Sequence, residues 1–121
     1  MKGIHTPLAL LFYGMAISDN NLDLGEKKEI YDAINSVKEV SISEKEKEEM
    51  YDTLREAIKN NLSSETSLER FKEFYVQHKT HFSETLKAEI LELIDGIALK
   101  MNGRNKSESV YYSQVFLLFQ Q

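Results

Sequence analysis

The stretch DNNLDLGE at residues 19–26 separates a nearly all-apolar segment from an amphipathic one. Before it, residues 8–17 carry apolar or small side chains all round, which is typical of a buried helix. After it, apolar side chains recur at helical spacing from Ile30 to Val37. The stretch therefore predicts a loop that joins a central buried helix to an amphipathic helix.

The first helix has a recognisable start. Thr6 is a good N-cap, and Pro7 suits the first helical position because its missing N–H would have no partner there. The apolar run after Pro7 is too short to span a bilayer. We therefore expect a buried helix to about residue 18, and neither a membrane-inserted segment nor a signal peptide.

Caps and apolar spacing predict the remaining helices. Ser43 and Glu46 form a capping box, and Asn60-Asn61 is a typical helix end. No segment shows a sustained period of two. The fold class is therefore all-α, a compact bundle of about six helices in a single domain over residues 1–121. The expected helices after the first cover about residues 24–37, 44–59, 64–78, 83–101 and 107–119.

Composition excludes several classes of function. The chain has no cysteine, which rules out disulfides, thiolate metal sites and cysteine nucleophiles. It carries 20 acidic and 15 basic side chains, and a net charge of −5 does not suit a nucleic-acid binder. We expect a cytoplasmic protein that does not bind nucleic acid.

When the sequence is compared with itself at a shift of 82 positions, its two ends match each other. Asn20 then aligns with Asn102 and Glu26 with Glu108, while apolar positions of the first helix align with those of the fifth. The loop and the glutamate at the helix start match at one and the same shift. We interpret the two ends as related helix–loop–helix units that flank the middle pair of helices.

The acidic loop has the alternation of a calcium-binding loop. Asp19, Asn21 and Asp23 occupy alternate positions, so their oxygens can converge on one hard cation. The match to an EF-hand then fails, because Leu24 replaces the turn glycine and Ile30 replaces the bidentate glutamate. The loop is therefore not an EF-hand.

Two interpretations of the loop stay open. One is a looser site for a divalent cation such as calcium, with Asp19, Asn21, Asp23 and Glu26 as ligands. The other is purely structural, because Asp23 and Glu26 form a capping box and acidic side chains stabilise a helix start.

Ala16, Asp19 and Glu26 carry a resemblance to a known family. A buried helix ends in Ala-x-x-Asp, and a glutamate seven residues after the aspartate opens the next helix. This pattern resembles the TerB-like tellurite-resistance family and the N-terminal domain of the DjlA co-chaperone. Asn20 departs from that family's pattern, which has a glycine after the aspartate.

The second copy of the pattern is less acidic. It runs from Ala98 to Asn102-Gly103 and then to Glu108, with Asn102 in place of the second aspartate. The resemblance implies an all-helical stress-response domain whose acidic residues bind metal. It adds Glu108 to the candidate ligands Asp19 and Glu26.

Three possible zinc ligands follow one another at intervals of three: His78, His81 and Glu84. On a continuous helix they would share one face, where they could bind zinc. Thr80 and Ser83 indicate instead that the helix breaks between them. The histidines would then face solvent or cap a helix end.

A row of acidic residues lies on the fifth helix. Glu89, Glu92 and Asp95 follow at a spacing of three, and either face solvent or line the groove between the two units. Asp95 aligns with Tyr13 under the repeat. We hypothesise that Tyr13 donates a hydrogen bond to Asp95, because a buried aspartate needs a partner.

The C-terminal segment is aromatic and apolar. Tyr111, Tyr112 and the run from Val115 to Phe119 form either part of the core or an exposed patch for a partner helix or a second copy of the chain. No nucleophile with a neighbouring base can be identified, so we expect no enzyme.

These observations lead to an ordered set of functions. We expect a stress-related scaffold with a hard-metal site in the acidic loop. The alternative is a metal-free interaction module that uses the groove between the units or the C-terminal aromatics. A metal-dependent hydrolase comes third. The expected partner is another protein, and components of membrane-associated complexes are among the candidates. A second copy of the chain, in a homodimer, is the other expected partner.

Overall fold

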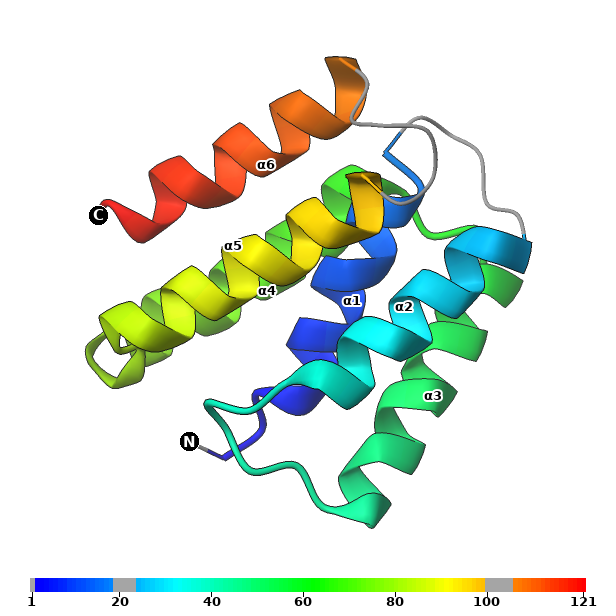
Figure 1. Ribbon diagram of the computed structural model, residues 1–121, viewed down its shortest axis with the longest axis horizontal. Helices are drawn as coiled ribbons and strands as arrows, with labels where there is room; N and C mark the ends of the chain where they lie inside the picture. The colour runs from blue at the N-terminus through cyan, green and yellow to red at the C-terminus, as the bar shows by residue number, and fades with distance from the viewer. Residues whose placement is uncertain (1, 19–23, 100–105) are drawn as a thin grey trace.

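The computed structural model of the protein describes residues 2–18, 24–99 and 106–121. Within these ranges the chain forms six α-helices and a 3-10 turn without any strand, so the all-α bundle is confirmed (Figure 1). The elements are α1 (His5–Ala16), α2 (Leu24–Ser36), α3 (Glu44–Lys59), α4 (Ser64–His78), η1 (Lys79–His81), α5 (Glu84–Leu99) and α6 (Lys106–Phe119).

Helix α1 is the centre of the bundle. Every residue from Leu8 to Ala16 is buried, and α1 packs against each of the other five helices. The helix has no polar face because it is enclosed on all sides. This confirms the prediction made from its apolar sequence.

The start of α1 differs from the prediction. The helix begins at His5 with Ile4 as its N-cap, two residues before Pro7. Ile4 is buried in the core, and its carbonyl accepts the first helical hydrogen bond from the N–H of Leu8 at 3.0 Å. Burial of Ile4 thus overrides the Thr6 cap, and Pro7 is tolerated because it still lies in the first turn.

The caps of α3 follow the sequence closely. The hydroxyl of Ser43 accepts from the N–H of Glu46, and the carboxylate of Glu46 accepts from the N–H of Ser43. At the other end Asn61 has a positive φ of 50°, a conformation that asparagine tolerates after a helix. The capping box and the helix end are both confirmed.

Helix α6 is fixed to the bundle at two places. In its first half, the hydroxyl of Tyr111 donates to the carbonyl of Leu11 in α1 at 2.8 Å. Near its end, Phe119 packs against the rings of Phe71, Tyr75 and Phe82. Two anchors that far apart hold one face of α6 against α1, α4 and α5.

The close approach of Tyr111 depends on Gly14 in α1. A Cβ added at Gly14 would overlap the hydroxyl and ring of Tyr111. Gly96 in α5 is different, because a Cβ there would meet nothing within 4 Å. Gly14 is therefore required for packing, and Gly96 is not.

The C-terminal aromatics divide between core and surface. Tyr111, Val115, Leu118 and Phe119 are buried, as the core interpretation predicts. Phe116 and Leu117 are 43% and 62% exposed. The segment therefore supplies both a packed face and an outer apolar face.

The two predicted helix–loop–helix units correspond to α1–α2 and α5–α6. The helices of each pair are in contact with each other. Phe116, which aligns with the buried Ile34, is partly exposed. The repeat itself stays a prediction.

Among the described residues, none of the helices combines the length and the apolar content needed to cross a bilayer.

Candidate functional site

Most of the predicted metal ligands lie outside the described part of the chain. Asp19, Asn21 and Asp23 fall in the undescribed residues 19–23, and Glu26 is placed only by its backbone, in the first turn of α2. In the described ranges, no three histidine, aspartate or glutamate side chains gather closely enough to hold a metal ion. The cation site therefore stays a prediction.

Glu108 is the predicted ligand whose side chain the structure describes. It lies in the first turn of α6 and is buried, with 6% of its surface exposed. A carboxylate is favoured at a helix N-terminus, where the backbone N–H groups carry partial positive charge. Glu108 therefore places a buried carboxylate at the start of α6.

His78 and His81 are separated by a break in the helix, as Thr80 and Ser83 predict. Helix α4 ends at His78, and the hydroxyl of Ser83 caps α5 by accepting from the N–H of Leu86 at 3.1 Å. The ring of His78 stacks on Phe74, with centroids 4.0 Å apart, and its Nδ1 lies 3.0 Å from the Phe74 carbonyl oxygen. These contacts give His78 a structural role.

Tyr13 does not pair with Asp95, so that hypothesis is wrong. Its hydroxyl donates to the carbonyl of Leu62 at 2.8 Å and lies 3.3 Å from the carbonyl of Ala57. A hydroxyl has one hydrogen to donate, and here it goes to the α3–α4 turn. The alignment of Tyr13 with Asp95 gave their positions in two helices but not the directions of their side chains.

A cluster of one histidine and two glutamates, which the sequence did not indicate, joins α1 to α3. The ring of His5 lies between two carboxylates, with Nδ1 3.5 Å from Glu46 and Nε2 3.6 Å from Glu49. Hydrogen bonding from the backbone N–H and hydroxyl of Ser43 lowers the pKa of Glu46. Because the two carboxylates face different ring nitrogens, this cluster does not chelate a single ion.

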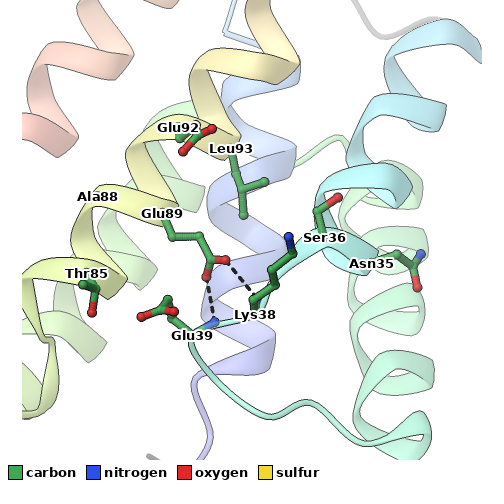
Figure 2. A pocket seen from close by; sticks show the side chains of 9 residues that line it. All are labelled: Asn35, Ser36, Lys38, Glu39, Thr85, Ala88, Glu89, Glu92 and Leu93. Atoms are coloured by element: carbon green, nitrogen blue, oxygen red, sulfur yellow. Dashed lines mark hydrogen bonds between the residues drawn. The ribbon is translucent and has the colours of Figure 1, made fainter.

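A groove lies between α2 and α5, one helix from each predicted unit (Figure 2). Its volume is about 720 Å³. The wall formed by α2 and the residues after it comes from Asn35, Ser36, Lys38 and Glu39, and the wall formed by α5 comes from Thr85, Ala88, Glu89, Glu92 and Leu93. We call this the α2–α5 groove.

Glu89 holds the two walls in place. Figure 2 shows its carboxylate reaching from α5 to the chain that follows α2. One oxygen accepts from the N–H of Lys38 at 2.9 Å, and the other accepts from the N–H of Glu39 at 3.1 Å. The carboxylate therefore satisfies two backbone donors just beyond the end of α2 and fixes the path of the chain there.

The α2–α5 groove is mainly acidic at its rim. Its described lining carries the carboxylates of Glu39, Glu89 and Glu92 and the ammonium of Lys38. The side chains of Glu39 and Glu92 are exposed, whereas Leu93 is partly buried and packs on the core. The groove thus combines negative charge with an apolar wall.

The sequence predicted part of this site. It placed Glu89 and Glu92 either on the surface or in the groove between the units, and the structure places both in the lining. Lys38 and Glu39 were missed. Both lie about 50 residues from Glu89 in the chain, and the sequence carries no local signal for that contact.

Comparisons of the chain with protein-family models, with curated proteins and with solved structures find no match. The TerB-like resemblance therefore rests on Ala16, Asp19 and Glu26 and on their second copy.

Proposed function

We propose that this protein is a non-catalytic binding domain whose α2–α5 groove holds a short basic segment of a partner protein. One observation supports the proposal above others: three carboxylates and a partly buried leucine line one groove. Complementary charge raises the rate of encounter and selects the partner. An apolar wall adds affinity when a side chain of the partner covers it.

The chemistry of the groove defines the segment. Lysine or arginine side chains would lie near Glu39 and Glu92, which are exposed and so accessible to a partner. An apolar side chain between two cations would cover Leu93. Glu89 already accepts two backbone hydrogen bonds, so it contributes negative charge without changing its contacts.

A labelled peptide tests this proposal. The probe is a short synthetic peptide in which lysines flank a leucine, and its matched control carries glutamates in place of the lysines. We expect fluorescence anisotropy to show binding of the lysine peptide alone. Because the attraction is electrostatic and the rim is exposed, added salt should weaken binding.

Two charge-reversal variants make the test specific to the groove. Glu92→Lys reverses an exposed charge at the rim, and Glu69→Lys makes the same change on the exposed face of α4. We expect Glu92→Lys to weaken binding about tenfold, because the variant repels the lysines of the peptide that Glu92 attracts. A factor of ten corresponds to about 1.4 kcal/mol. Equal weakening by both variants would show that net charge alone attracts the peptide, and the groove proposal would be wrong.

Binding of a hard cation by the acidic loop is the second candidate function, as part of the stress-related scaffold that the TerB-like resemblance implies. The burial of Glu108 favours it. Attraction between a carboxylate and a cation strengthens away from bulk water. The proposed ligands are Asp19, Asn21, Asp23, Glu26 and Glu108.

Calorimetry with calcium, magnesium, manganese and zinc tests the cation hypothesis. We expect heat of binding for at least one ion and its loss in Asp19→Ala. Asp32→Ala is the matched control, because Asp32 is an exposed aspartate on α2. Absence of heat for every ion would remove this hypothesis and leave the groove proposal intact.

A further inference from the structure

The outer face of α6 carries an apolar stripe that the rest of the bundle does not cover. Val110 and Leu117 are 52% and 62% exposed, and they lie seven residues apart on the side opposite the buried face. Ser113 lies between them and is also exposed. In Figure 1, α6 runs along one edge of the bundle. This stripe is separate from the α2–α5 groove.

The stripe has the spacing of a helix–helix seam. Exposed residues follow at intervals of four and three along α6 and just past its end, which keeps them on one face of the helix. In order they are Lys106, Val110, Ser113, Leu117 and Gln120. Such a seam favours another helix as the occupant.

From the geometry of this stripe, we propose that α6 pairs in antiparallel orientation with α6 of a second copy of this chain. Antiparallel pairing centred near Ser113 sets Val110 of each copy against Leu117 of the other. The small serine at the centre allows the two helices to approach closely. The contact is isologous, so the same face serves in both copies.

Charge favours this partner and this orientation. Residues 109–121 contain no charged side chain, although the whole chain has a net charge of −5. When two acidic molecules meet at this stretch, residues 109–121 therefore add no charge repulsion of their own. Antiparallel pairing also brings Lys106 to the C-terminal end of the partner helix, where the helix dipole is negative, whereas parallel pairing would set Lys106 against Lys106.

The same features argue against a membrane as the occupant. A helix that lies on an anionic membrane usually carries several lysines or arginines on its polar face. Lys106 is the single basic residue of α6. A second copy therefore suits the stripe better than a lipid surface does.

Sedimentation velocity over a range of protein concentrations tests the pairing. We expect the wild-type protein to shift from monomer to dimer as concentration rises. Leu117→Lys should raise the dissociation constant at least about tenfold, because it removes an apolar contact and places like charges near each other. Val76→Lys is the matched control, since Val76 is 59% exposed and belongs to α4 rather than to α6.

Each outcome of this experiment decides the proposal. A dimer that Leu117→Lys weakens and Val76→Lys leaves unchanged supports it, provided that circular dichroism shows both variants folded. A wild-type protein that stays monomeric throughout would overturn it. Equal weakening by both lysine variants, or by neither, would also overturn it and would point to another surface.

Cross-linking tests the orientation separately. The chain has no native cysteine, so single cysteines introduced at Val110 and Leu117 give unambiguous products. When Val110→Cys and Leu117→Cys proteins are mixed and oxidised, antiparallel pairing favours the mixed disulfide. If each variant instead links mainly to itself, the antiparallel arrangement is wrong.

Discussion

Gly14 shows how one residue sets the distance between two helices. The absence of a side chain at this position lets the ring and hydroxyl of Tyr111 lie directly against α1. The hydroxyl then reaches the carbonyl of Leu11, which lies 100 residues away in the chain. The position of α6 therefore depends on a missing methyl group in α1.

Substitution of Gly14 tests this dependence. We expect Gly14→Ala to lower the free energy of unfolding by about 1–3 kcal/mol, because the methyl group forces Tyr111 outward. Gly96→Ala is the matched control within a helix, where the open space and the better helix propensity of alanine predict a gain of up to about 1 kcal/mol. Urea denaturation measures both, and equal effects of the two changes would contradict this account.

At the scale of the element, Tyr111 anchors α6 on α1. Burial raises the pKa of Tyr111 far above its ordinary value. An unfolded tyrosine ionises near pH 10. Below that pH the hydroxyl of Tyr111 is protonated in both the folded and the unfolded state. As the pH rises above it, the unfolded chain loses this proton while the folded protein retains it.

Stability should therefore fall as pH rises above about 10, and Tyr111→Phe should reduce the steepness of that fall. At neutral pH the same variant should lower the free energy of unfolding by about 1 kcal/mol, because a buried hydrogen bond is lost. Denaturation curves collected across the alkaline range measure both effects. If the variant and the wild-type protein lost stability with the same slope, Tyr111 would not be the group that retains the proton.

Element boundaries were predictable where local chemistry decides them. Ser43, Glu46 and Asn61 act within a few residues of their own positions, so their roles in α3 followed from the sequence. The start of α1 did not, because burial of Ile4 in the core decides it. Contacts from distant elements, such as that of Ile4, have no local signal.

At the scale of the whole molecule, the sequence predicted the class of fold but not the position of the groove. The apolar run of α1 was sufficient to predict a bundle around a central helix. The contacts of Glu89 with Lys38 and Glu39 depend on how α2 and α5 pack, and so does the groove that these residues line. Tyr13 was assigned the wrong partner for the same reason.

The central claim is that the α2–α5 groove binds a basic segment, and NMR titration of the ¹⁵N-labelled protein with the lysine–leucine peptide tests it most directly. We predict that chemical-shift changes concentrate at the backbone amides of Lys38, Glu39, Thr85, Glu89 and Glu92, and that they disappear in Glu92→Lys. Changes that cluster on α3 or α4, or a spectrum that the peptide does not alter, would contradict the claim.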